Sequence, residues 1–228
     1  MAAPTVRAGV KTTTSFSASV VVTTVATYLP GDVLLVGLAS DVTVTTTPPA
    51  GFTLIKRVAD SAFGNDQILE SYAKIAVTNE PATFTFTLST AEVFAAFMVA
   101  IQGAQTSTTP HKSAVSTAVG GVALINAPSV TTTVSDCLIL TLYGVDNSPA
   151  ASVTYASLSM TEVVDITISS WASISMYSTT KAVAGGVSTY AVTSSPTGLN
   201  GRLMQTIAFA PSDQPYQPWM LWGPVMAQ

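Results

Sequence analysis

Two blocks of sequence occur twice in this 228-residue chain, in the same order and at nearly the same spacing. Residues 30–41, PGDVLLVGLASD, are similar to residues 134–146, VSDCLILTLYGVD, and residues 76–104 align with 182–210 without a gap. The identical residues of the first block include Asp32 and Asp136, Leu34 and Leu138, and Leu38 and Leu142. A chain that repeats at a fixed offset builds one supersecondary unit more than once. The duplication therefore predicts a fold made of two similar halves.

The duplication also predicts how the chain is divided. We expect half-repeats at about 20–105 and 128–210, joined by a polar linker at 106–127, within a single β-sandwich domain at 20–210. The flanking segments would be an N-terminal arm, 1–19, and an apolar, proline-rich C-terminal arm, 211–228.

Alternation of apolar and hydroxyl side chains predicts β-strands within each half. The stretch ATFTFTLS at 82–89 places Phe84, Phe86 and Leu88 on one face and threonines on the other. Residues 91–101, AEVFAAFMVAI, have the propensity of a helix. Their repeat partner, TGLNGRLMQTI, contains two glycines and an asparagine, so we predict a strand in both places. The expected fold class is all-β: an antiparallel, jelly-roll-like β-sandwich with extended terminal arms.

Two of the expected strands, 33–38 and 137–142, are apolar on both faces. A two-layer sandwich buries only one face of each sheet. The second face must then be covered by a loop of the same chain, by the linker or by another subunit, and the last of these is a first indication of assembly. The side chains expected in the core are Leu34, Val36, Leu38, Phe84, Phe86, Leu138, Leu140 and Leu142.

The composition limits the classes of partner. Charged residues make up 9% of the chain, whereas about 25% is ordinary, and 59 residues are Ser or Thr. This indicates a strand-rich protein with a hydroxylic surface. A net charge of -4 with scattered basic residues argues against binding to nucleic acid. No apolar run reaches the roughly 18 residues of a membrane span, and the start lacks the apolar core of a secretory signal. We expect synthesis and use in the cytoplasm, or release by lysis.

Residues that could carry catalysis are few. His111 is the single histidine and lies on the expected linker, and Cys137, the single cysteine, lies inside an apolar strand. A surface histidine and an inert buried thiol are the simpler interpretation. Glycoside hydrolysis needs paired carboxylates. The acids that could supply them are Asp60, Asp66 and Glu70, or Asp146, Glu162 and Asp165. We expect no catalytic, cofactor-binding or metal-binding residues and no enzymatic activity.

Several motifs together resemble a known module. They are GDVLLVGLASD, PPAGFTLIKR, SYAKIAVTNEPATFTFTLS, FMVAIQGA and the second copy PSVTTTVSDCLILTLYGVD. In this order they resemble a β-sandwich module of virion proteins of tailed bacteriophages, over about 20–210. The aromatic after Pro-Pro-Ala-Gly is Phe52, where that family often has tryptophan, and the turn is Asn79-Glu80-Pro81. The resemblance implies a jelly-roll-like domain with a structural or adhesive role and no catalytic residues.

We expect a virion structural protein that decorates or cements the capsid by binding neighbouring capsid subunits, with the major capsid protein as its first partner. It would be made in the host cytoplasm and reside in the virion, in the head rather than the tail. It would form a homo-oligomer, with a trimer as first choice, and bind neither nucleic acid nor membrane. The alternatives are a tail or baseplate component that contacts the host surface, and a carbohydrate-binding module or glycosidase. An aromatic platform on one strand face would favour the carbohydrate-binding module or glycosidase. The residues available for such a platform are Trp171, Tyr177 and Tyr155.

The C-terminal segment, PSDQPYQPWMLWGPVMAQ, carries a single charge at Asp213. Its four prolines prevent a helix and hold the chain extended. The apolar anchors, which are the expected partner-binding residues, are Tyr216, Trp219, Met220, Leu221, Trp222, Val225 and Met226. We interpret this segment as an arm that crosses onto a neighbouring molecule. The alternative is that it folds back and covers the second apolar face of its own sandwich.

Overall fold

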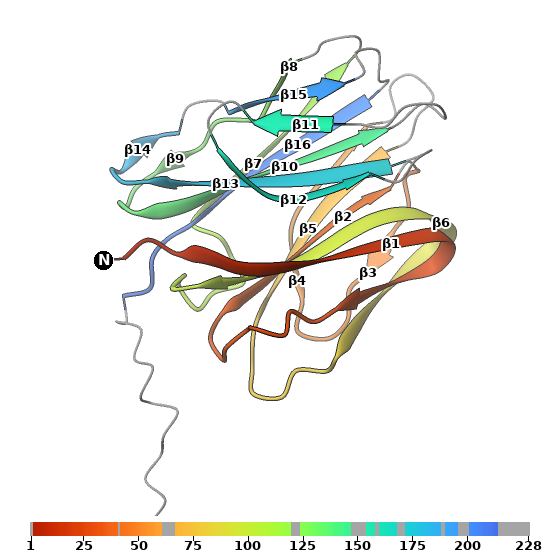
Figure 1. The fold of residues 1–228 in the computed structure, drawn as a ribbon, viewed down its shortest axis with the longest axis horizontal. Coiled ribbons are helices and arrows are strands. Elements are labelled where there is room, and N and C mark those ends of the chain that lie inside the picture. The colour runs from red at the N-terminus through yellow and green to blue at the C-terminus, as the bar shows by residue number, and fades with distance from the viewer. Residues whose placement is uncertain are drawn as a thin grey trace, which may run out of the picture.

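A computed structural model of the chain describes residues 2–40, 42–60, 67–119, 124–146, 154–157, 160–167, 172–187, 190–195 and 201–213. Within these residues the regular elements are all β-strands, and every strand pairing is antiparallel. The strands form two large sheets that pack face to face, with smaller strand groups outside them (Figure 1). The all-β sandwich predicted from the sequence is therefore confirmed.

The first large sheet is built from the N-terminal half of the chain. Its strand order is β1 (Thr5–Thr23), β6 (Thr83–Gln102), β2 (Val33–Ser40), β5 (Gln67–Ile75) and β4 (Thr53–Asp60). The short strand β3 (Thr46–Thr47) pairs with β6 outside this order. The segment 91–101 belongs to β6, so the prediction of a strand rather than a helix is confirmed there.

The second large sheet is built from the C-terminal half. Its order is β12 (Thr161–Thr167), β13 (Ala172–Lys181), β10 (Cys137–Asp146), β16 (Gly201–Phe209) and β7 (Lys112–Val119). A three-stranded sheet contains β11 (Thr154–Ser157), β15 (Ala191–Ser195) and β8 (Leu124–Asn126). A two-stranded sheet contains β14 (Gly185–Gly186) and β9 (Thr131–Thr132).

The two large sheets have the same strand order when each half is read along the chain. In each, the first strand of the sheet along the chain lies at one edge, the last strand of the sheet lies beside it, and the second strand of the sheet lies at the centre. A jelly roll passes repeatedly between its two sheets. In this molecule each sheet is completed within one half of the chain, so the jelly-roll-like connectivity we expected is not the one observed.

Two segments expected to lie outside the sandwich are strands of it. Residues 5–19 of the expected N-terminal arm belong to β1, and the expected linker, 106–127, contains β7 and β8. Both β1 and β7 are edge strands. An edge strand has a side without a neighbour and tolerates polar residues, so its alternation of apolar and polar side chains is weak. This is why the sequence did not reveal them.

The main core lies between the two sheets. Leu35, Phe97 and Val99 of the first sheet and Leu140 and Ile207 of the second belong to one cluster of fully buried side chains. The eight residues predicted to be buried are all buried, namely Leu34, Val36, Leu38, Phe84, Phe86, Leu138, Leu140 and Leu142. Three of them, the leucines of β10, lie in this core.

The outer face of the first sheet is covered by the same chain. The pairing of β1 with β6 shifts register at Thr14–Ser17 and again at Ser17–Ser19. The two strands curve together at this point (Figure 1). Beyond the bend, Val20 and Phe86 belong to a second buried cluster with Leu34 and Leu38 of β2. The curved pair of strands β1 and β6 therefore covers the doubly apolar strand, and the indication of assembly drawn from that strand no longer holds.

The outer face of the second sheet is covered in the same way. Cys137 and Ile139 are buried with Val130 and Val187, which precede and follow the central strands. Further along the strand, Tyr143 is buried with Tyr177, Ala127 and Met204. All these groups belong to residues 127–210 of the chain.

The alignment of the first repeated block is one residue out of phase with the fold. Leu34 lies on the outer side of its sheet, whereas Leu138, which was aligned with it, lies in the core between the sheets. A one-residue slip moves every side chain of a strand to the opposite face. The left-handed residue before each strand shows the same slip, because it is Gly31 in the first half and Asp136 in the second.

Candidate functional site

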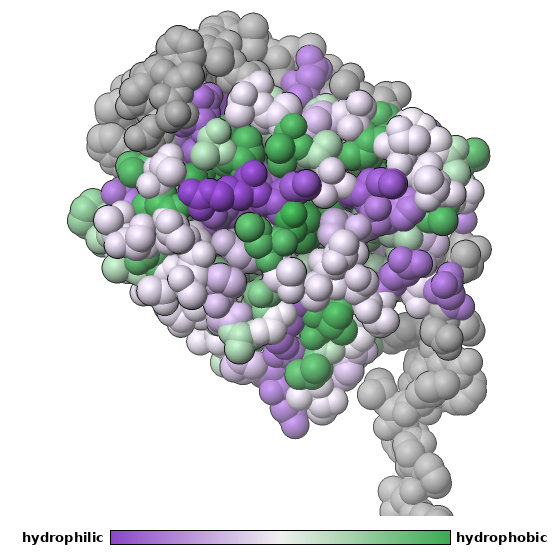
Figure 2. Space-filling view, turned by 180° about the vertical axis from the view of Figure 1, so that it is seen from behind, coloured by the Kyte–Doolittle hydropathy of each residue, from purple (hydrophilic) through white to green (hydrophobic). Residues whose placement is uncertain are grey.

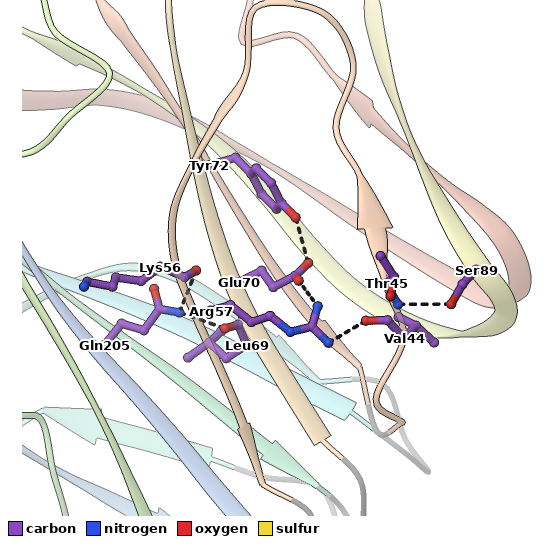
Figure 3. Close-up of polar contacts among 9 residues, drawn as sticks. All are labelled: Val44, Thr45, Lys56, Arg57, Leu69, Glu70, Tyr72, Ser89 and Gln205. Atoms are coloured by element: carbon purple, nitrogen blue, oxygen red, sulfur yellow. Dashed lines mark hydrogen bonds and ion pairs between the residues drawn. The ribbon is translucent and has the colours of Figure 1, made fainter.

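One of the first three acids predicted for catalysis, Glu70, lies in a buried polar network, and a second, Asp60, is buried at the end of β4. Glu70 of β5 is fully buried and forms an ion pair with Arg57 of β4. The phenol of Tyr72 donates to the other carboxylate oxygen at 3.0 Å, and Arg57 also donates to the carbonyl of Val44 at 2.6 Å (Figure 3). Both carboxylate oxygens of Glu70 are therefore engaged, and burial together with Glu70 raises the pKa of Tyr72. The third acid, Asp66, lies outside the described residues.

This network stabilises the fold. It connects two neighbouring strands to the segment before β3. Beside it, Gln205 extends from the second sheet and donates to the carbonyl of Leu69 in the first sheet at 2.8 Å (Figure 3). A carboxylate held by a guanidinium and a phenol has no free oxygen with which to take a proton from a substrate. We assign Glu70 a structural role.

The environments of the single histidine and the single cysteine also favour structural roles over catalytic ones. The ring nitrogen Nε2 of His111 accepts a hydrogen bond from the backbone N–H of Thr133 at 3.0 Å, and desolvation and Lys112 lower the pKa of the imidazole. Cys137 is fully buried, and burial followed by the charge of Asp136 raises the pKa of its thiol. A protonated, enclosed thiol is a poor nucleophile.

The second set of acids is partly brought together. Glu162 and Asp165 lie on the edge strand β12 and face Tyr177 and Ser175 across the pairing with β13. Burial raises the pKa of Asp165 to about 6, Glu162 adds to that effect, and Lys11 opposes it. Tyr177 and Ser175 are buried. The side chain of the third acid, Asp146, lies outside the described residues.

A groove of about 800 Å³ opens where β1 passes the ends of β12 and β13. Its walls are residues 4–9 on one side and Thr161–Val163 and Ser178–Thr180 on the other, with Leu138 and Met160. At one end Arg7 donates to Asp32 at 3.0 Å. Burial raises the pKa of Asp32, and hydrogen bonds from the backbone N–H of Leu29 and from Arg7 oppose this. The lining combines threonine and serine residues with apolar residues and the charged Arg7 and Glu162, and it contains no aromatic ring.

Of the three residues that could form the aromatic platform of a carbohydrate-binding module, only Tyr177 has a described side chain, and it is buried. Tyr177 is 1% exposed, so its ring cannot stack on a sugar. Trp171 and the side chain of Tyr155 lie outside the described residues.

The seven predicted anchor residues of the C-terminal segment lie outside the described residues, but the chain leading to them is held on the sandwich. Ala104 and Pro211 form a bridge, and the N–H of Ser212 donates to the carbonyl of Gly103 at 2.7 Å. Because Gln102 pairs with Thr5, residues 211–213 lie near the N-terminal end of β1, which lines the groove (Figure 1).

The surface of the described residues has the weakly polar character predicted from composition. Figure 2 shows a face on which pale residues predominate, with a hydrophilic band and small separate hydrophobic groups. The described residues contain no helix of a length and hydropathy that could cross a membrane. Nor do three or more His, Cys, Asp or Glu side chains gather among them as a metal site.

Comparisons with protein families, with curated proteins and with solved structures give no match to this chain.

Proposed function

We propose that this chain is a structural protein of a bacteriophage virion that decorates the capsid, and that its C-terminal segment binds a neighbouring capsid subunit. The observation that carries the proposal is that described residues within 20–210 cover the outer faces of both sheets, while the sequence after Asp213 is rich in apolar residues. The resemblance of 20–210 to a virion β-sandwich module supplies the biological setting.

The covered faces favour contact with another molecule over folding back. The alternative role for residues 214–228 was to cover the second apolar face of 33–38 or 137–142. Leu34, Val36 and Leu38 are already buried in a cluster with residues of the β1–β6 strand pair, and Cys137 and Ile139 are buried by their own half. Among the described residues these two faces are already covered, and this supports a partner surface as the environment of the anchors.

The reach and the energetics of the segment suit a repeated lattice. Fifteen residues beyond Asp213 extend up to about 50 Å, which is enough to cross onto a neighbour. Ordering an extended segment costs about 1–2 kcal/mol per residue, so a single arm binds modestly even with several aromatic anchors. On a capsid, many arms act together through effective concentration.

The assembly state is part of the proposal. We propose a homo-oligomer, with a trimer first, in which the partner of the arm is the major capsid protein and the role is not enzymatic. The weakly charged surface supports association, but the doubly apolar strands do not, because the chain covers them itself. Light scattering at micromolar concentration tests this directly, and a stable monomer that stays monomeric on the capsid would contradict it.

The decisive experiment removes the arm without touching the sandwich. We compare the full chain, a truncation after Asp213, and a chain in which 214–228 is replaced by a Gly/Ser segment of equal length. Each is tested for cooperative unfolding and for binding to parent capsids that lack this protein. We expect both altered chains to unfold like the full chain and to lose capsid binding. Normal binding would show that the segment is not an anchor, and loss of folding would show that it covers its own sandwich.

The position in the particle needs a separate measurement. Mass spectrometry of separated heads and tails is expected to find the chain in the heads. Its presence only in tails would replace decoration by the tail or baseplate alternative, in which the same arm would join tail subunits.

A further inference from the structure

A β-bulge in the edge strand β12 brings two carboxylates to one face of the second sheet. Residues three apart in a regular strand point to opposite faces. The pairing of β12 with β13 shifts register between Glu162 and Val164, so Glu162 lies opposite Tyr177 and Asp165 lies opposite Ser175. Bulges re-aim side chains in this way and are common at sheet edges. Directly opposed residues have Cβ atoms about 5 Å apart.

The neighbouring residues show on which face of the second sheet these side chains lie. Val164 and Ile166 of β12 and Met176 of β13 lie in the core between the sheets. Tyr177 lies in the outer cluster with Tyr143, and their rings meet edge to face at a centroid distance of 5.9 Å. The two carboxylates and the two hydroxyls therefore form a block of four oxygen-bearing side chains on the outer side of the second sheet.

The two hydroxyls in this block are buried and lie close to each other. Tyr177 is 1% exposed and Ser175 is fully buried, and beyond this mutual contact neither oxygen meets a partner at hydrogen-bond geometry in the described part of the chain. One carboxylate oxygen of Asp165, Oδ1, is likewise buried without a partner at such geometry. Leaving a buried polar group unsatisfied costs about 1–3 kcal/mol, more if it is charged, so this under-satisfied group of three oxygens calls for an explanation.

The groups around the block do not supply the missing contacts. The Nζ of Lys11, from β1, donates to the backbone carbonyl of Asp165 at 2.6 Å. The phenol of Tyr143 donates to the carbonyl of Tyr190 at 3.0 Å. Glu162 is solvent-exposed and leaves the block open to ions from solution.

We propose that Glu162, Asp165, Ser175 and Tyr177 bind a hard divalent cation of the calcium type. Calcium takes six to eight oxygen ligands in irregular arrangements, including carboxylates, carbonyls and water, whereas magnesium demands an octahedron and transition metals favour nitrogen or sulfur. Two carboxylates supply the charge, the hydroxyls supply neutral oxygens, and water completes the shell. The proposal does not depend on the virion role. Its effect would be to hold the edge strand β12 on the sheet.

Calorimetric titration with calcium chloride tests the site in the full chain after treatment with EDTA. With two carboxylates we expect a dissociation constant of about 0.1–1 mM, as in the weaker extracellular calcium modules. Calcium should also raise the unfolding temperature, and magnesium should do so less. Glu162→Gln and Asp165→Asn should each weaken binding at least about tenfold. Glu92→Gln, which makes the same change of charge on β6, is the control and should bind like the wild type.

Two further variants separate the buried site from a loose surface contact. Tyr177→Phe and Ser175→Ala remove only the hydroxyls, and we expect each to weaken calcium binding severalfold while circular dichroism stays unchanged. If both bind calcium like the wild type, the cation contacts only exposed carboxylates and the proposed site is refuted. Absence of calcium binding by the wild type up to 10-fold above the expected constant, or unchanged binding by both carboxylate variants, would also refute it.

Discussion

Asp165 is a residue whose ionisation opposes folding. Burial is the main cause, and Glu162 adds to it, so the pKa of the carboxyl rises from its ordinary value of 3.8 to about 6 in the folded protein. Below pH 4 both the folded and the unfolded chain hold the proton. Between pH 4 and 6 the unfolded chain releases it first, so this carboxyl makes the folded state progressively less stable as the pH rises.

Replacing Asp165 by Asn should therefore stabilise the metal-free protein only where the wild-type carboxyl is ionised. In urea unfolding with EDTA present, we expect Asp165→Asn to be more stable than the wild type at pH 8 and equal to it at pH 4. Most of the change should occur between pH 4 and 6. A difference between the two proteins that is the same at pH 4 and pH 8 would contradict the assigned cause.

Leu140 represents the core residues that sequence reasoning identified correctly. It is fully buried between the sheets. Leu140→Ala should lower the free energy of unfolding by about 2–5 kcal/mol, because it removes apolar contacts and leaves a cavity. Val183→Ala, at a site 69% exposed, is the control and should change it by less than about 0.5 kcal/mol. A loss below about 1 kcal/mol at Leu140 would mean that the inter-sheet core is less tightly packed than described.

The two central strands, β2 and β10, differ in how closely neighbouring side chains approach their glycines. A Cβ on Gly37 would lie 2.4 Å from the ring of Phe97 and 3.1 Å from Ile174. A Cβ on Gly144 would meet Leu69 at 3.4 Å, which is ordinary contact. Both glycines lie within strands, but only at Gly37 do the surrounding atoms leave no room for a Cβ.

A matched pair of alanine substitutions tests this difference. Gly37→Ala should lower the free energy of unfolding by about 1–3 kcal/mol, because the fully buried ring of Phe97 must move. Gly144→Ala should be neutral or stabilise by up to about 1 kcal/mol, since alanine restricts the unfolded chain more than glycine does. Chemical denaturation of both variants measures the contrast, and equal effects would show that side chains pack less tightly around Gly37 than described.

The strands that could be predicted from the sequence are those whose side chains alternate or are apolar throughout. Phe84, Phe86 and the leucines of β2 and β10 revealed their strands in this way. The sequences of edge strands such as β1 and β7 did not reveal them as strands. An edge strand rich in serine and threonine has a sequence like that of a loop. The slip between Leu34 and Leu138 was also hidden, since both faces of these strands are apolar and either phase satisfies the pattern.

The polar block on β12 could not be predicted because it depends on tertiary pairing. Glu162 and Asp165 were named as candidate acids, but their spacing places them on opposite faces of a regular strand. Only the bulge against β13 aligns them with Ser175 and Tyr177. Sequence offers no signal for the bulge, and it gave no reason to choose Ser175 among so many serines.

At the level of the whole molecule, the two halves share one core and each also has its own. The cluster between the sheets takes Leu35 and Val99 from the first half and Leu140 and Ile207 from the second. The outer clusters are each built within one half. A separated half would therefore keep its outer cluster but expose the inner face of its sheet, an apolar surface that soluble monomers rarely display.

Cutting the chain between the halves tests this shared dependence. The exposed stretch before β7 is a suitable place, so we compare fragments 1–108 and 109–228, expressed separately and together. Each fragment alone should self-associate or bind a hydrophobic dye, because its inner face is uncovered. Expressed together, they should form a 1:1 complex that unfolds in one cooperative transition, since the inner cluster is then complete. Size-exclusion chromatography with light scattering and thermal unfolding measure both outcomes. A fragment 1–108 that stays monomeric, ignores the dye and unfolds cooperatively would show that the first half is an independent domain and that the inner core joins two domains rather than forming one.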